Sequence, residues 1–351
     1  MSLLAYVLSF SSIAALVASP VTAQAHVREL YHLGEKVELE NLAVRSGGQV
    51  LTTGVNRAVV YQFDPAADDA PTALVQIPDA NSVFGIAEYA PDVFAVTAGN
   101  WTRGAPLVPG TFSVWTVDLG AAAPAPRKLA DFPRAAFLNG MTAVPRAGGN
   151  STLLITDTGA GTIYHLDPTT ATVAPVLAPA NGTNVTATRE LPQMGINGIR
   201  YNAASATLYF TNTLKRVFVK VPLAIEPAAS GLPRITAAGP FTVVASDVMG
   251  DDFAVAADGT AYIGANPVNT VYRVTPAGAV SVVAGGPRES IVAGASSAAF
   301  GVTERTKHVV YATTNGLPVL ANGTATMTEG GKLIQITLAE DEEEEGDACE
   351  D

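Results

Sequence analysis

A short apolar segment with alternating side chains recurs six times along this chain of 351 residues. The centres of the six copies are Tyr61, Trp115, Tyr164, Phe218, Tyr272 and Ile334. Successive centres lie 49 to 62 residues apart, a spacing typical of propeller blades, each of which holds several short strands. The period-two alternation, together with 32 glycines and 23 prolines, predicts an all-β chain. We therefore expect a six-bladed β-propeller with four-stranded blades.

Two more strands are expected ahead of each central segment. In the fifth repeat, an apolar run at Ala261–Ile263 precedes Tyr272, and the turn Asp258-Gly259 separates that run from an innermost strand. An extra strand at Val27–His32 precedes the first repeat, where it can pair with the last blade and close the ring. Two separate β-sandwiches are the alternative, but they would not give six copies at such regular spacing.

Composition narrows the classes of partner. Hydrophobic residues make up 48% of the chain and charged residues 15%, which indicates a packed body rather than a disordered chain or a multi-span membrane protein. The formal net charge is −12, and part of it comes from an acidic run between Glu340 and Asp351. Because such a balance repels phosphate and anionic lipid, we expect no nucleic-acid partner and no membrane partner. No protein partner is predicted, and a small molecule is the expected ligand.

The two ends of the chain differ in composition from its middle. We expect a cleaved signal peptide at residues 1–23, the propeller at 24–338 and a disordered acidic tail at 339–351. The single cysteine, Cys349, has no intrachain partner, so the fold must be held by its core. Secretion is also favoured by five N-glycosylation triplets. Their acceptors are Asn100, Asn150, Asn181, Asn184 and Asn322.

Residues that open the innermost strands converge on the central channel of a propeller. Asn139-Gly140 and Asn197-Gly198 open two successive repeats, and carboxylates at Glu40 and Asp252 open the first and the fifth. Oxygen ligands of this kind suit Ca²⁺ or a similar hard divalent cation. Asn-Gly is also an ordinary turn dipeptide, but its matching position in successive repeats favours a functional site.

Other residues near the predicted strand openings are candidates for contact with a ligand. Thr303 is a candidate hydrogen-bond donor together with Asn139 and Asn197, and Glu88 is a candidate substrate contact. The apolar candidates for a substrate-binding wall, each of which could equally belong to the propeller core, are Phe84, Phe137, Met141, Phe253 and Phe300.

With Glu40, Asn139, Asn197 and Asp252 in this order, the chain resembles the senescence-marker-protein, gluconolactonase and regucalcin superfamily. The resemblance implies a metal held by Glu40, Asn197 and Asp252, with Asn139 facing the substrate. The chain departs from the family pattern at Asp251-Asp252-Phe253, which leaves either aspartate as the ligand. No histidine opens a repeat, which argues against paraoxonase-type histidine chemistry.

The runs ENLAVR, PDVFAV, FLNGM, NGIRYN and DDFAV resemble the secreted fungal branch of this superfamily more closely. That resemblance implies a role in secondary metabolism and, in some members, hetero-Diels-Alder cyclisation of a tropolone quinone methide with a humulene-type sesquiterpene. Such a pericyclase needs no cofactor, and its candidate catalytic residues here are Asn139, Asn197, Asp252 and Thr303. A lactonase that depends on a divalent cation is the first alternative, and a binding protein without catalysis is the second.

Overall fold

The computed structural model describes residues 25–34, 37–67, 69–103, 105–146, 149–177, 195–228, 231–286, 289–317 and 329–339. The expected signal peptide, the acidic tail from residue 340 and the acceptors Asn181, Asn184 and Asn322 lie outside the described residues. All the elements in the described ranges are strands. No helix in these ranges has the length and apolar character needed to cross a membrane.

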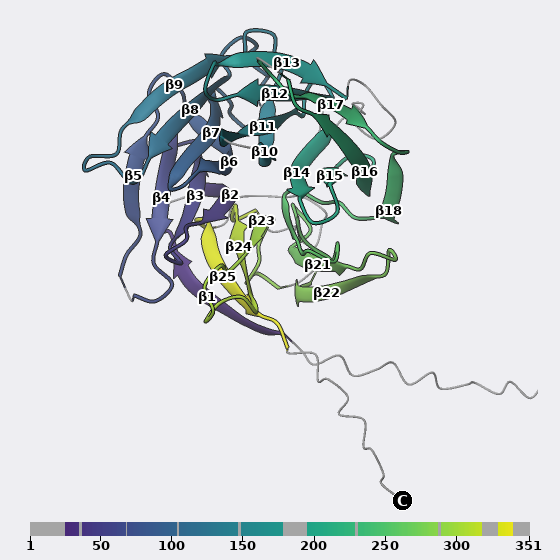
Figure 1. The fold of residues 1–351 in the computed structure, drawn as a ribbon. Helices are drawn as coiled ribbons and strands as arrows, with labels where there is room; N and C mark the ends of the chain where they lie inside the picture. Colours follow the sequence, from purple (N-terminus) through teal and green to yellow (C-terminus); the bar gives the residue numbers. More distant parts are fainter. Residues whose placement is uncertain are drawn as a thin grey trace, which may run out of the picture.

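Six antiparallel sheets stand in a ring, which confirms the predicted propeller (Figure 1). The innermost strands are β2 (Glu38–Val44), β6 (Ser82–Ala90), β10 (Leu138–Arg146), β14 (Ile196–Asn202), β19 (Phe253–Val255) and β23 (Ala295–Phe300). The second strands are β3 (Val50–Val55), β7 (Val93–Gly99), β11 (Gly149–Asp157), β15 (Thr207–Asn212), β20 (Ala261–Ala265) and β24 (Val309–Thr314). The third strands carry the recurring apolar segment, and they are β4 (Val59–Phe63), β8 (Ser113–Asp118), β12 (Thr162–Asp167), β16 (Val217–Glu226), β21 (Thr270–Val274) and β25 (Lys332–Thr337).

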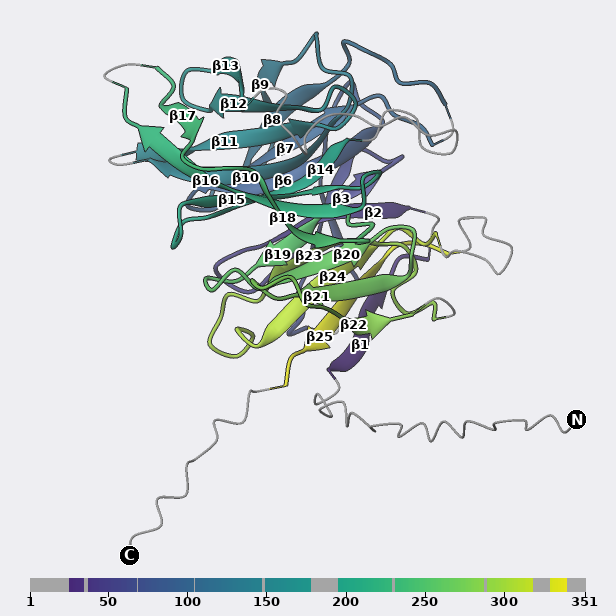
Figure 2. The ribbon, with the colours of Figure 1, turned by 90° about the vertical axis from the view of Figure 1, so that its right-hand side faces the viewer.

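The outermost strands complete the blades and close the ring. Four of them are β5 (Thr72–Gln76), β9 (Pro126–Asp131), β13 (Thr172–Val176) and β22 (Val280–Gly285). The outermost strand of the sixth blade is β1 (His26–His32), which pairs antiparallel with β25 near the two ends of the described chain (Figures 1 and 2). The closing role predicted for residues 27–32 is therefore confirmed.

The fourth blade has one strand more than predicted. Its third strand β16 is ten residues long, and two outer strands share it. The first half of β16 pairs with β18 (Thr242–Ser246), and the second half pairs with β17 (Arg234–Ala237). The long β16 therefore extends past the blade and forms a small outer ribbon.

The hydrophobic core is divided among the interfaces between blades. Six clusters of buried apolar residues occur in the described chain, and each joins neighbouring blades. In the cluster between the sixth and first blades, for example, Tyr311 of β24 packs with Leu42 of β2. Because each blade is apolar on both faces, its strands bury their side chains against the next blade in the ring. This closed arrangement explains how the fold is held without a disulfide.

Candidate functional site

A β-bulge recurs near the start of the innermost strands. In the first blade Leu39 pairs with Gly54 and Leu42 pairs with Thr52, so that Glu40 and Asn41 both lie opposite Thr53. Register shifts of the same kind fall at Phe84-Gly85, Asn139-Gly140 and Asn197-Gly198. Because a bulge changes the direction of the side chains that it carries, it sends them to places that strict alternation would not reach.

A buried threonine of the second strand lies opposite the bulge in five blades. Its hydroxyl donates a hydrogen bond to a backbone carbonyl in, or just before, the innermost strand of the next blade, at oxygen distances of 2.6 to 3.2 Å. We call these five residues the bulge threonines: Thr53, Thr97, Thr156, Thr211 and Thr313. The carbonyls that they hold belong to Phe84, Asn139, Asn197, Asp251 and Glu40. The side chains of these same five residues line one cavity.

The glycines of the two Asn-Gly pairs are needed for close approach between blades. A Cβ atom on Gly140 would lie 2.6 Å from the carbonyl oxygen of Asn197, and one on Gly198 would lie 2.5 Å from that of Asp251. Side-chain carbon atoms do not come so near to a carbonyl oxygen, so these positions admit only glycine without a shift of the backbone. The dipeptide is therefore a packing element of the ring rather than a turn.

The cavity has a volume of about 130 Å³ and lies at the end of the channel where the innermost strands begin. Its apolar side consists of Val55, Phe84, Trp101, Phe137, Pro267 and Leu317. Its polar side consists of Glu38, Glu40, Arg103, Asn139, Asn197, Thr213, Asp251 and Asn266. The cavity can therefore contact hydrocarbon with one part of its surface and oxygen-bearing groups with the other.

Three aromatic rings form the apolar wall. Trp101 stacks on Phe137 with an interplanar angle of 10° and a centroid distance of 5.8 Å, and Phe84 meets Phe137 edge to face at 4.9 Å. Phe84 and Phe137 are almost fully buried. These contacts lock the rings against one another, so the wall presents a rigid apolar surface to a ligand.

The polar floor carries acceptor atoms that no protein group satisfies. Within the described chain, Oδ1 of Asn139, Oδ1 of Asn197 and Oδ1 of Asp251 are buried and have no hydrogen-bond partner. The other atoms are held in place, since Asn197 donates to Thr213 at 3.0 Å and Asn266 donates to Asp251 at 3.0 Å. Buried acceptors without partners are costly. They indicate a site for a hydroxyl-bearing ligand or for a cation.

Burial also changes the protonation of the carboxyls at this floor. It raises the pKa of Glu40 well above its usual range, and the nearby charges of Asp251 and Asp252 raise it further. Burial raises the pKa of Asp251 to about 7, and repulsion from Asp252 adds to the effect. When it is protonated, Glu40 can donate a hydrogen bond to a carbonyl oxygen. The floor can thus offer a donor as well as acceptors.

Asp252 lies below the cavity, in a separate network across the channel. Its two oxygens accept hydrogen bonds from Arg200 at 3.0 Å and from Asn41 at 2.6 Å. Arg200 also donates to Asn41 at 3.1 Å, and Ser297 donates to the same Asn41 oxygen at 3.1 Å. The structure therefore corrects the predicted placement: Asp251 lines the cavity, whereas Asp252 pairs with a guanidinium. The fifth blade was counted one residue out of register.

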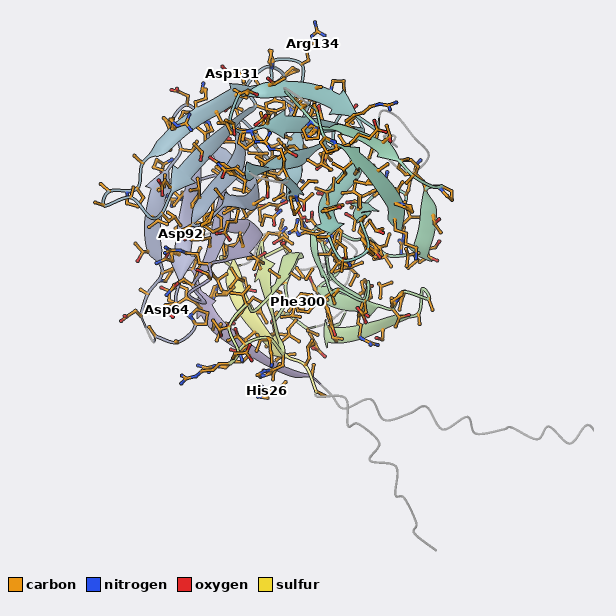
Figure 3. All side chains as sticks on the ribbon, in the orientation of Figure 1. His26, Asp64, Asp92, Asp131, Arg134 and Phe300 are labelled. Carbon is orange, nitrogen blue, oxygen red and sulfur yellow. The ribbon has the colours of Figure 1, made fainter. Side chains whose placement is uncertain are left out.

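The predicted residues Glu40, Asn139 and Asn197 line the cavity, and so do the predicted wall residues Phe84 and Phe137, but five other predicted contacts do not. Met141 and Phe253 are buried in the core between blades. Glu88 accepts a hydrogen bond from the backbone of Asp92 in the turn after β6. Phe300, labelled in Figure 3, ends β23 of the sixth blade and packs edge to face on Tyr262 of the fifth blade. Thr303 follows β23, bonds to Thr306 and likewise lies outside the cavity lining.

Two of the predicted glycosylation acceptors lie within the described residues. Asn100 is half-buried in the loop after β7. Asn150 is exposed at the start of β11 and lines a groove between the second and third blades. Glycosylation of the five acceptors stays a prediction.

The donor set of the floor fits a hard divalent cation. Glu40, Asn197 and Asp251 could hold it, with Asn139 beside them, because three of the four side chains offer an unpaired buried oxygen. No cluster of three or more His, Cys, Asp or Glu side chains suited to a metal occurs in the described ranges, so a cation here would depend on amide oxygens.

Comparison with known proteins confirms the resemblance. No family model matches the chain. The chain is 28% identical over 307 residues to asR5 of Sarocladium schorii, which carries the provisional name hetero-Diels-Alderase; the match covers 78% of this chain and 74% of asR5. Its fold resembles that of a calcium-binding regucalcin from Agrobacterium tumefaciens, with a TM-score of 0.58, 15% identity and coverage of 90% and 94%. It also resembles a protein provisionally described as a gluconolactonase, with a TM-score of 0.55, 13% identity and coverage of 90% and 92%.

These comparisons agree with the observed architecture. The chain is a six-bladed propeller whose fold resembles that of these two structures. Sequence reasoning did not select Glu38, Trp101 or Arg103 as site residues, and it left Asp251 and Asp252 as alternative ligands. Asp251 could have been chosen by aligning Asp251-Asp252 with the bulge pairs Glu40-Asn41 and Asn139-Gly140. No repeat signal marks Trp101 and Arg103, because both stand on the loop between β7 and β8.

Proposed function

We propose that this protein is a secreted hetero-Diels-Alderase that joins a tropolone quinone methide to a humulene-type sesquiterpene in secondary metabolism. The observation that carries the proposal is the division of the cavity into an aromatic wall and a polar floor. The similarity to asR5 supports the same class of reaction. The proposal includes N-glycosylation and a small molecule as the partner, without nucleic acid, membrane or protein partners.

For this reaction the main task of the protein is to orient the two reactants. The two π bonds of the heterodiene and the π bond of the alkene are consumed, and their six electrons form two σ bonds and one new π bond. One σ bond joins the heterodiene oxygen to an alkene carbon, the other joins the terminal carbon of the heterodiene to the second alkene carbon, and no atom leaves. A protein that holds both partners in a reactive geometry can supply roughly 7 to 11 kcal/mol of such a barrier. The cycloaddition therefore requires no cofactor.

The residues of the cavity have different roles in orienting and polarising the two reactants. Phe84, Trp101 and Phe137 contact the hydrocarbon and keep the alkene against one face of the diene. Asn139 donates its amide N–H to an oxygen of the conjugated ring and favours the polarised form that reacts, and the unpaired Oδ1 atoms of Asn139 and Asn197 accept a hydrogen bond from a ligand hydroxyl. A cavity of about 130 Å³ encloses the reacting ends, and the rest of a sesquiterpene extends through the open end.

Lactone hydrolysis dependent on a divalent cation is the alternative that a specific observation favours. The unpaired oxygens of Asn139, Asn197 and Asp251 are suited to a cation as well as to a hydroxyl. When bound, the cation would polarise an ester carbonyl and lower the pKa of a bound water. Glu40, Asn197 and Asp251 would hold it, and Asn139 would orient the lactone oxygen. Binding without catalysis is the second alternative, which the same assay detects.

One experiment separates the three functions. Purified protein is mixed with an oxygenated diene precursor and a humulene-type alkene, with and without a chelator, and the rate and stereochemistry of the adduct are compared with the uncatalysed reaction. We expect acceleration and one dominant stereoisomer in both conditions. Asn139→Leu should lower the rate by roughly 10² to 10³, by analogy with the loss of an oxyanion-site donor. Phe300→Ala, outside the cavity, is the control.

Two results would overturn the proposal. An unchanged rate and isomer mixture together with chelator-sensitive cleavage of a lactone would establish the hydrolase instead. Saturable binding of the diene precursor with neither reaction would establish a binding protein.

A further inference from the structure

Arg103 is the only lysine, arginine or histidine among the described residues that line the cavity. The other ionisable groups of the lining are the carboxyls of Glu38, Glu40 and Asp251. Arg103 stands on the loop between β7 and β8, and its side chain is 43% exposed, whereas that of Glu38 is 5% exposed. The guanidinium therefore lies where the cavity meets solvent, at the mouth rather than at the floor.

Two contacts fix the guanidinium in one orientation. Nε donates to Oε1 of Glu38 at 3.2 Å, and Nη2 donates to Oε2 of the same carboxylate. The Cζ atom lies 5.3 Å from the centre of the Trp101 ring. The Nη1 edge makes no hydrogen bond within the described part of the chain. A planar fork held on two sides keeps its remaining donors in a defined place before a ligand arrives.

We propose that the Nη1 edge of Arg103 binds an ionised oxygen of a planar conjugated ligand and thereby sets which end of the ligand enters the cavity first. The ligand class is a ring in which an acidic hydroxyl is conjugated with a carbonyl. This inference rests on the proposed function and deepens it, because it assigns the ionised oxygen of the diene partner to the mouth and its polarised carbonyl to the floor.

Charge and shape both favour this class of ligand. The chain has a formal net charge of −12, and three carboxyls line the cavity, so an anionic oxygen has one favourable place in it. A flat ring fits the aromatic wall of Phe84, Trp101 and Phe137, whose rings are already locked together. An aliphatic anion would satisfy Arg103 but would leave that wall without a partner.

The competing role for Arg103 is a structural one. A buried carboxylate needs a partner, and Arg103 could serve only to neutralise Glu38. The two roles differ in what removal of the guanidinium does to ligands. A structural partner affects all ligands of similar shape alike, whereas an oxyanion-binding group affects only those that carry the ionised oxygen.

Tropolone and tropone provide a matched pair of probes, because the second lacks only the hydroxyl. Their affinities are measured by calorimetry, and by quenching of Trp101 fluorescence in a Trp115→Phe background, at a pH where tropolone is ionised. We expect the wild type to bind tropolone at least about tenfold more tightly than tropone, and Arg103→Gln to remove this difference while tropone binding stays within about twofold. Arg103→Lys should keep part of the difference. Arg127→Gln, on the outer groove, is the control and should change neither affinity.

The outcomes are decisive in each direction. If Arg103→Gln is unstable, the double variant Arg103→Gln with Glu38→Gln removes the unpaired carboxylate and is measured in its place. A wild type that binds neither probe, or that does not distinguish them, overturns the inference, and so does a variant that keeps the full preference for tropolone. A wild type that prefers tropolone through Arg103 but forms no cycloadduct supports this inference and overturns the proposed function alone.

Discussion

Replacement of one bulge threonine by valine should destabilise the fold far more than the same replacement at the preceding residue. The hydroxyl of Thr53 accepts a hydrogen bond from the backbone N–H of Asn41 at 2.9 Å and donates one to the carbonyl of Phe84 at 2.6 Å. The hydroxyl of Thr52 is equally buried and has no partner in the described chain. The two residues therefore offer the same substitution with and without a hydrogen bond.

The expected magnitudes follow from these contacts. Thr53→Val removes two hydrogen bonds and leaves a buried N–H and a buried carbonyl unsatisfied, which should lower the free energy of unfolding by about 2 to 4 kcal/mol. Thr52→Val removes a buried hydroxyl that has no partner, so it should be neutral or stabilising by up to about 1 kcal/mol. Both substitutions introduce a residue with high β-propensity, so propensity cancels in the comparison.

Urea unfolding followed by tryptophan fluorescence measures the difference, with the slope compared between variants to confirm that the same surface unfolds. Where unfolding is irreversible, the midpoints of thermal scans at one fixed rate serve the same purpose. If Thr52→Val destabilises as much as Thr53→Val, packing around the strand matters and the bond across the blades does not. Comparable losses at both positions would therefore refute the role assigned to the bulge threonines.

Three further predictions concern stability. Burial lowers the pKa of His165 from 6.5 to about 4, so the unfolded state binds its proton first as the pH falls. In the wild type the free energy of unfolding should therefore fall by about 2 kcal/mol on this account between pH 7.5 and pH 5, and His165→Leu should abolish that fall. Urea titrations at several pH values measure it, and an unchanged dependence of the unfolding free energy on pH would contradict the prediction. Arg200→Met should cost about 3 to 5 kcal/mol by leaving Asp252 buried without a cation, and adding Asp252→Leu should recover much of it; simple additivity would argue against the pair. Gly140→Ala should lower the thermal midpoint by several degrees, while Gly34→Ala, with open space around it, should not; equal shifts would refute the close approach.

The sequence predicted the architecture because the architecture is repeated. The central segments, such as those around Tyr61 and Tyr272, are long enough to show period-two alternation. The regular spacing of the six segments gave the number of blades. The closing strand was predicted because residues 27–32 formed a strand left over ahead of the first repeat. An error in one repeat did not affect this result, since the other copies carried the same information.

Site residues were predicted correctly only in the blades where the sequence pattern marks the position of the bulge. Asn139 and Asn197 were found because each precedes a glycine that the packing of the ring requires. The sixth blade has Ser296-Ser297 at its register shift, with no glycine to mark it, so Phe300-Gly301 was taken as its opening instead. In the fifth blade two successive aspartates, Asp251 and Asp252, left the choice of carboxylate open. Alternation cannot resolve that choice, because both aspartates precede the short strand β19 in which alternation would hold.

The bulge threonines also explain how equivalent backbone positions can carry side chains of different chemical types. They bind the backbone carbonyls of five cavity residues and make no contact that depends on the side chains of those residues. Glutamate, phenylalanine, asparagine and aspartate therefore occupy equivalent positions around one cavity, at Glu40, Phe84, Asn139 and Asp251 among others. A single substitution at such a position changes the chemistry of the cavity while leaving the ring intact. Because the backbone is supported independently of the cavity side chains, proteins that share this fold can differ in reaction. The reaction of this protein therefore follows from the aromatic wall and the polar floor of its own cavity.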